Sequence, residues 1–122
     1  MVNIKECESY ITRDGSLIRE ILAPRNSSLE GLSLAEATVS VGGTTIEHYH
    51  EGTEEIYYIL SGQGEIVIEG QGASVRAGDG IVIPAGAMHK IQNRGDDDLV
   101  FLCICAPPYE HEKTVITESK RL

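Results

Sequence analysis

Apolar and polar residues alternate in short segments through the middle of this chain, and turn-forming residues separate one segment from the next. The segments are rich in β-branched and aromatic residues; they cover residues 44–50, 55–60, 65–69, 73–77, 81–83 and 88–93. Gly-rich or Pro-containing turns recur between them at intervals of about 8 to 12 residues. This pattern predicts an all-β fold, either a sandwich or a barrel.

The segments on either side of this region are less regular. Residues 32–41 alternate partly and predict a strand, and a short strand is expected at residues 10–12. Residues 17–22 fit one helical turn or an edge strand, and the sequence does not decide between them. Asp14-Gly15 is a turn signal between residues 10–12 and residues 17–22. Residues 99–106 are apolar at both odd and even positions, so both faces of this segment should be covered.

Length and charge exclude several classes of protein. The chain has 122 residues, the size of one domain, and a formal net charge of −9. A chain this acidic, without a basic stripe, is not expected to bind nucleic acid or an anionic membrane surface. Its odd number of cysteines fits a reducing compartment. Because the N-terminus lacks the apolar run of a signal peptide and no segment approaches the ~20 apolar residues of a membrane span, we expect a cytoplasmic protein.

Three of the four histidines and one glutamate fall in two short segments. His48 and His50 are two residues apart in a strand-like segment, so their imidazoles should point to the same face. Glu55 follows after a short turn, and His89 lies in a second segment marked by glycines and a proline. Imidazole nitrogens and a carboxylate oxygen are common ligands of transition metals. The two segments therefore predict a metal site.

These segments resemble the two motifs of the cupin superfamily. The first motif, G-x5-H-x-H-x3,4-E-x6-G, is met by Gly42, His48, His50, Glu55 and Gly62. The second, G-x5-P-x-G-x2-H-x3-N, is met by Gly78, Pro84, Gly86, His89 and Asn93. The resemblance implies a double-stranded β-helix, or jelly-roll, barrel. We expect a single domain over residues 1–122, with a core barrel at about 33–106, an N-terminal arm at 1–32 and a short polar tail at 107–122.

The resemblance also implies that four residues hold one divalent transition metal ion: His48, His50, Glu55 and His89. This set of three nitrogens and one oxygen suits Fe, Mn, Ni, Zn or Cu, and affinity alone does not choose among them. Glu54 also fits the variable spacing of the motif. Only Glu55, however, leaves six residues before Gly62 and shares a strand face with Tyr57 and Ile59. We expect Asn93 to make hydrogen bonds at the barrel end and not to bind the ion.

Other residues carry weaker predictions. The wall of a substrate pocket is expected to include Tyr57, Ile59, Met88, Phe101 and Cys103, with ordinary core packing as the alternative. Cys103 and Cys105 share one face of a strand; we expect inert thiols, with a redox pair as the alternative. Tyr109 and His111 follow two prolines, and we expect them in an exposed tail, although a segment folded over the barrel mouth is also compatible with the sequence.

Cupins catalyse many reactions, so the motifs predict a metal site but not a reaction. The first hypothesis is a metal-dependent oxygenase that acts on a small organic molecule. The second is a metal-dependent sugar-phosphate isomerase, epimerase or lyase, for which Lys90 and Arg94 are the nearest cations in sequence. The third is a non-enzymatic ligand-binding or sensing protein. We also expect a homodimer, because residues 99–106 and the N-terminal arm need a covering surface.

Overall fold

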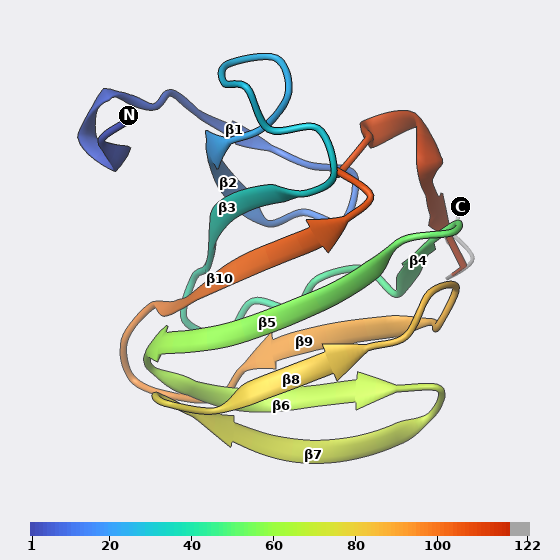
Figure 1. Cartoon of the computed structure of the whole chain (residues 1–122). Helices are drawn as coiled ribbons and strands as arrows, with labels where there is room; N and C mark the ends of the chain where they lie inside the picture. Colours follow the sequence, from blue (N-terminus) through green and yellow to red (C-terminus); the bar gives the residue numbers. More distant parts are fainter. Residues whose placement is uncertain (118–122) are drawn as a thin grey trace.

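The computed structural model describes residues 1–117 and arranges them in two antiparallel sheets that enclose a common interior (Figure 1). In order across the sheet, the six-stranded sheet contains β1 (Ser9–Ile11), β2 (Leu17–Leu22), β3 (Ser33–Val39), β10 (Leu99–Ala106), β5 (Glu54–Ser61) and β8 (Gly80–Ile83). The five-stranded sheet contains β11 (Thr114–Ile116), β4 (His48–His50), β9 (His89–Asn93), β6 (Gln63–Ile68) and β7 (Gln71–Arg76). The helical segments of the described chain are two single 3-10 turns, η1 (Ile4–Glu6) and η2 (His111–Lys113). The expected all-β jelly-roll barrel is confirmed.

None of the helical segments within residues 1–117 is long and apolar enough to cross a lipid bilayer.

The N-terminal arm contributes two strands to the six-stranded sheet. Residues 17–22, for which the sequence allowed a helical turn, form β2, and β2 pairs with β3 in the register Ile18↔Ala37. β1 then pairs with β2 through a turn at Asp14-Gly15. Without this hairpin β3 would present an unpaired edge, and edge strands are usually covered. The hairpin matters for the site because it carries Asp14 to the barrel interior.

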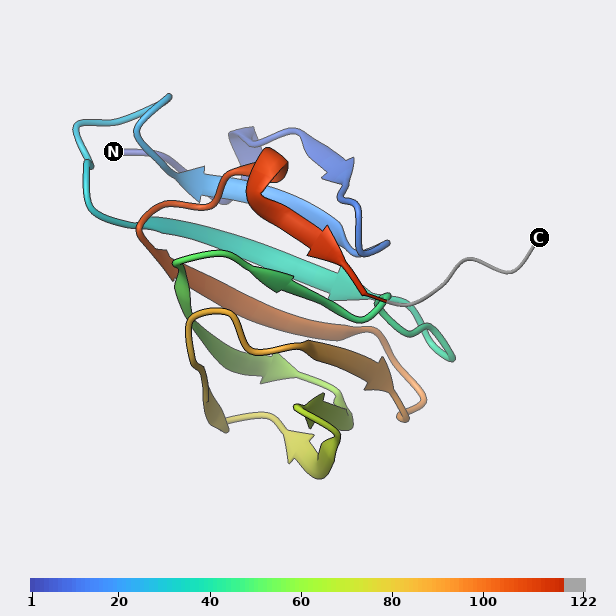
Figure 2. The same ribbon diagram turned by 90° about the vertical axis from the view of Figure 1, so that its right-hand side faces the viewer.

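The segment after β10 returns across the barrel and pairs with β4, as Figure 2 shows from the side. In this pairing Thr114 lies opposite His50. The expected tail therefore contains a strand next to the predicted metal ligands, although its last five positions, 118–122, lie outside the described residues.

Strand alternation directs one set of side chains into the barrel. Along β5 the residues alternate between exposed and buried, and Glu55, Tyr57 and Ile59 all point inward. Their apolar members pack in one core: Ile18, Ala37, Val39, Tyr57, Ile59, Ile66, Val75, Ile83, Ala87, Ile91, Leu99 and Phe101. Because the core contains residues of both sheets, it fixes the sheets relative to each other and so fixes any site built from both.

Asn93 closes one end of the barrel, as the sequence predicts. Its side-chain amide donates to the carbonyl oxygens of Val39 and Asp97, at 2.9 and 2.8 Å. Its Oδ1 atom accepts from the backbone N–H of Gly95 at 2.8 Å. These bonds use the polar atoms of the buried side chain for structure and leave none for a metal ion.

Gly62 and Gly70 provide a matched test of the barrel corners. Both have positive φ, 88° and 79°. A Cβ atom at Gly62 would lie 2.7 Å from the backbone oxygen of Asp98, whereas a Cβ atom at Gly70 would meet nothing within 4 Å. We expect Gly70→Ala to lower the free energy of unfolding by about 1 to 2 kcal/mol from backbone conformation alone. Gly62→Ala should cost a further ~1 to 3 kcal/mol from overpacking. Chemical denaturation measures both losses. Equal losses would contradict an overpacking cost at Gly62 from the nearby Asp98 backbone.

Candidate metal centre

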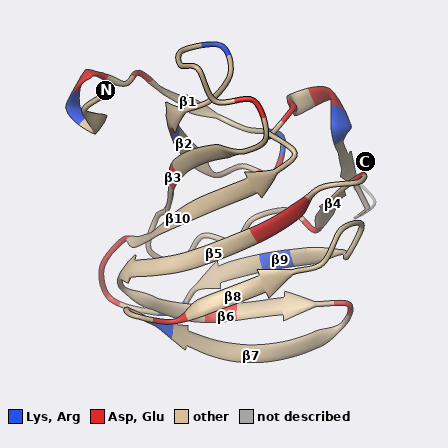
Figure 3. Cartoon of the chain, in the orientation of Figure 1, with Lys and Arg blue, Asp and Glu red and all other residues tan. Residues whose placement is uncertain are grey.

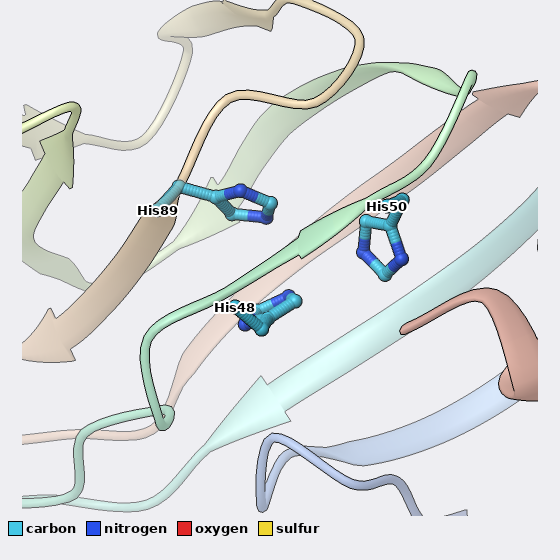
Figure 4. Close-up of side chains that lie close together, drawn as sticks. All are labelled: His48, His50 and His89. Carbon is cyan, nitrogen blue, oxygen red and sulfur yellow. The ribbon is translucent and has the colours of Figure 1, made fainter. Parts of the chain in front are cut away.

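Three histidine side chains meet inside the barrel (Figure 4). His48 and His50 belong to β4, and His89 begins β9 directly opposite His48 in the register of the two strands. The ring centroids of His48 and His89 are 4.3 Å apart, and those of His48 and His50 are 5.0 Å apart. One nitrogen from each ring lies within 4.8 Å of the other two. The pairing of β4 with β9 thus brings histidines from two distant sequence segments together.

Hydrogen bonds on the far side of the rings determine which nitrogen is free. His48 Nδ1 lies 2.7 Å from the carbonyl oxygen of Ile46, and His89 Nδ1 lies 2.9 Å from that of Ala87. A carbonyl oxygen only accepts, so both Nδ1 atoms carry a proton, and in the neutral rings both Nε2 atoms keep a lone pair. His50 Nδ1 is paired with the hydroxyl of Thr114 at 3.2 Å. Such bonds orient imidazoles as metal ligands.

Glu55 approaches these rings from the opposite sheet. Its side chain is buried, at 4% exposure, whereas the neighbouring Glu54 is exposed. Glu55 Oε1 lies 3.3 Å from His50 Nε2 and 3.2 Å from His89 Nε2. Its other oxygen, Oε2, accepts a hydrogen bond from the thiol of Cys105 at 3.3 Å. The carboxylate therefore points one oxygen at the histidines and anchors the other.

Three buried polar atoms at this point have no hydrogen-bond partner among residues 1–117: His48 Nε2, His89 Nε2 and Glu55 Oε1. The Glu55 contacts are short enough for ion pairs but are not aligned as hydrogen bonds. Each unsatisfied buried group costs about 1 to 3 kcal/mol.

The distances at this point match those around a metal ion. Two ligand atoms that each lie ~2.1 Å from one ion would be about 3.0 to 3.4 Å apart, for bond angles between octahedral and tetrahedral values. The observed separations of Glu55 Oε1 from His50 and His89 fit a metal ion.

The anionic form of Glu55 and the neutral form of His48 also suit a cation. Burial alone would raise the pKa of Glu55, but the interactions with His50 and His89 outweigh burial and hold this pKa well below its usual range. Burial lowers the pKa of His48, which keeps its imidazole neutral. The same burial acts on His89, but the neighbouring Glu55 carboxylate raises its pKa overall. Glu55 is therefore anionic, as a ligand must be.

Comparison with known proteins places the chain in a family. A family model described as a Cupin domain matches residues 35–105, a range that includes His48, His50, Glu55 and His89. The chain belongs to the cupin family.

This cupin is 49% identical over 109 residues to the uncharacterized protein MJ1618 of Methanocaldococcus jannaschii, covering 89% of this chain and 87% of that protein. A predicted oxalate decarboxylase of Thermotoga maritima has a TM-score of 0.76 and 28% identity, covering 88% of this chain and 98% of that one. The polyketide cyclase RemF of Streptomyces resistomycificus has a TM-score of 0.82 and 23% identity, covering 98% of this chain and 86% of that one. At 23% identity the likeness shows the fold alone.

The interior of the cupin holds a cavity of about 40 Å³ that is lined by His50 and Glu55. Three of the residues expected on the pocket wall line it: Tyr57, Phe101 and Cys103. Ile59 is instead fully buried in the core. Met88 is 37% exposed and lies outside the cavity, because it precedes the inward-facing His89 and strand alternation turns it outward.

The structure adds two site residues that the sequence did not indicate, Asp14 and Thr114, and it decides between the two alternatives for Tyr109. Asp14 Oδ2 lies 3.3 Å from His48 Nε2, and Thr114 supports His50 from β11. Tyr109 is half-buried, lines the cavity and stacks edge-on to His50 with ring centroids 5.7 Å apart. The expected exposed tail is therefore wrong for Tyr109, whereas His111 is exposed and accepts a hydrogen bond from Arg13 Nε.

Cys103 and Cys105 are free thiols in the interior of the cupin. Burial, and then the nearby Glu55 carboxylate, raise the pKa of both thiols well above the usual value. A thiol that stays protonated is a poor nucleophile and a poor redox partner. These surroundings favour the inert role.

Proposed function

We propose that this cupin is a metal-dependent enzyme that acts on a small organic molecule, and that within this class it is an oxygenase. The observation that carries the proposal is the group of three buried, unsatisfied ligand atoms, His48 Nε2, His89 Nε2 and Glu55 Oε1. Of these three residues Glu55 lines the inner cavity, together with the neighbouring His50. A purely structural cluster would be expected to satisfy its polar atoms within the protein.

His48, His50, Glu55 and His89 would hold one divalent ion, with Fe, Mn, Ni, Zn and Cu all compatible with three nitrogens and one oxygen. When bound, such an ion supplies Lewis acidity and, for iron or manganese, redox chemistry with O2. The chain supplies the rest. Ile46, Ala87 and Thr114 orient the imidazoles, while the rings of Tyr57 and Phe101 limit water around the substrate.

Oxygen consumption tests the oxygenase proposal. Protein loaded with iron or manganese under anaerobic conditions is mixed with oxygenated buffer and a panel of small diols and enols, and O2 uptake is followed with an electrode. We expect substrate-dependent uptake in the wild type and its loss in His89→Ala. No uptake with any metal and substrate would count against an oxygenase, and tight retention of an unmodified ligand would favour a binding or sensing role.

The sugar-phosphate alternative has less support from the site. Lys90 and Arg94, the cations nearest in sequence, do not line the cavity, and Arg94 pairs with Glu65 at 3.0 Å. No lysine or arginine occurs among the described residues that line this cavity. A lyase remains the second candidate, because the Thermotoga maritima relative is named as a predicted decarboxylase.

We further propose that the protein is a homodimer joined through the outer face of the six-stranded sheet. That face exposes Ile56 and Tyr58 of β5 and Val82 of β8, at 45%, 43% and 65% exposure. β8 and β10 carry no charged residue, as Figure 3 shows. Contiguous exposed apolar surface of this kind marks an interaction site, and a second copy presents a matching face.

Light scattering after size-exclusion chromatography tests the dimer. We expect a mass of about twice 13.2 kDa for the wild type and a shift toward monomer in Ile56→Asp. Val41→Asp serves as the control, because Val41 is 56% exposed but lies in the loop after β3, away from this face. A monomeric wild type would refute the dimer.

A further inference from the structure

We propose that Asp14 is a specificity-determining residue, which makes the pocket select a ligand that keeps a hydroxyl proton over a carboxylate or phosphate anion. The inference rests on the proposed metal-dependent function and adds the substrate class. Asp14 belongs to neither cupin motif and lies in the turn between β1 and β2.

One oxygen of Asp14 is fixed by three hydrogen bonds. Oδ1 accepts from the hydroxyls of Thr12 and Ser16, at 2.6 and 2.7 Å, and from the backbone N–H of Ser16 at 2.9 Å. The backbone oxygen of Asp14 also accepts from the N–H of Ile46, at 2.7 Å, in the segment that leads into β4. The carboxylate is therefore held rigidly against the strand that carries His48.

The other oxygen is directed at the metal centre. Oδ2 lies 3.3 Å from His48 Nε2 and takes part in no hydrogen bond within residues 1–117. The side chain is 13% exposed and lines the cavity. An ionised carboxylate oxygen only accepts hydrogen bonds. A hydroxyl group placed in the cavity has a proton to donate to Oδ2, whereas a carboxylate or phosphate oxygen at that position would meet a like charge.

The charges around the cavity also disfavour an anionic ligand. Its carboxylates are Asp14, Glu20 and Glu55, and its described lining contains no lysine or arginine. Glu20 pairs with Arg25, but the Arg25 side chain is 68% exposed and belongs to the outer groove. A divalent ion held by Glu55 would be the main positive charge inside, and Asp14 would offset part of it. An anionic group inside the inner cavity therefore lacks the cationic side chains that usually recognise it.

The shape of the opening adds an aromatic preference. The inner cavity of about 40 Å³ adjoins an outer groove of about 790 Å³, and the two share Tyr10, Glu20 and Tyr109. A ligand with its hydroxyl groups in the inner cavity would extend its body between the two tyrosines. A phenol or an aromatic vicinal diol fits both requirements, because its ring is apolar and its hydroxyl groups donate hydrogen bonds.

Ligand binding to the Co²⁺-loaded protein tests this inference. Catechol and oxalate are titrated separately into the wild type, Asp14→Asn and Glu54→Gln, and the visible Co²⁺ spectrum reports each Kd. The same titrations with aqueous Co²⁺ give the intrinsic preference of the ion. The amide introduced by Asp14→Asn would keep an acceptor for Thr12 and Ser16 but would present an N–H group in place of Oδ2. Glu54→Gln removes an exposed charge outside the cavity.

The catechol-to-oxalate affinity ratio of the wild type is expected to exceed that of aqueous Co²⁺ by about 10-fold or more. In Asp14→Asn, catechol should bind about 10-fold more weakly and oxalate more tightly, with Glu54→Gln unchanged. The inference is overturned if the wild-type ratio does not exceed the aqueous one, or if a folded Asp14→Asn shifts neither affinity. A loss of Co²⁺ affinity of more than about 100-fold in Asp14→Asn would overturn it too, because Asp14 would then be a ligand. Failure of the wild type to bind Co²⁺ would instead refute the proposed metal-dependent function.

Discussion

Loading the cupin with a divalent transition metal is expected to raise its melting temperature by about 10 °C or more. In the metal-free protein His48 Nε2, His89 Nε2 and Glu55 Oε1 are buried without hydrogen-bond partners among the described residues. An ion that binds only the folded state at about 1,000 times its Kd stabilises that state by ~4 kcal/mol. For a domain of this size, each kcal/mol shifts the melting temperature by about 2 to 8 °C. Calorimetry with chelator and with added metal measures the shift.

His48→Phe provides the matched control for this shift. The variant fills the site of a buried imidazole with an apolar ring, so it removes a ligand and an unsatisfied nitrogen together. We expect the metal-induced shift to disappear in this variant. The metal-free variant should still fold but be about 1 to 3 kcal/mol less stable than the metal-free wild type, because phenylalanine removes the Nδ1–H donor of the Ile46 carbonyl oxygen. An equal metal-induced shift in both proteins would mean that the ion binds elsewhere.

Removing a single predicted ligand should weaken metal binding by more than about 100-fold, since even residues that only support ligands contribute about 10- to 100-fold. His89→Ala and Glu55→Ala test ligands from the two different sheets. His111→Ala and Glu54→Gln are the controls, because both residues are exposed. Competition with a chelating dye gives the affinities. Loss of binding in Glu54→Gln, with Glu55→Ala unaffected, would reverse the choice between the two glutamates.

The sequence predicted what depends on local pattern. Residues 54–60 show why: they alternate strictly between exposed and buried along β5, which places Glu54 outside the barrel and Glu55 inside it. The spacing of His48 and His50 likewise predicts two imidazoles on one face. For His89 the family motif was needed, because its place opposite His48 depends on the pairing of strands that are distant in sequence.

What the sequence missed came from long-range pairing. Asp14 was visible only as part of a turn, and its approach to His48 follows from the packing of the β1–β2 hairpin against the segment before β4. Tyr109 and Thr114 reach the site because β11 pairs with β4. Neither pairing has a periodic signal of its own, since β1, β4 and β11 contain three residues each. The residues that surround a substrate are largely of this kind, which is why the sequence predicted a metal site and not a reaction.

Elemental analysis of the purified protein tests the central claim most directly. Wild type, His48→Ala and His111→Ala are expressed with the same mixture of transition metals and purified without chelator. We predict about one equivalent of a transition metal per chain in the wild type and in His111→Ala, and a large loss in His48→Ala. A wild type without transition metal, or a folded His48→Ala with the same content as the wild type, would contradict a metal centre at His48, His50, Glu55 and His89.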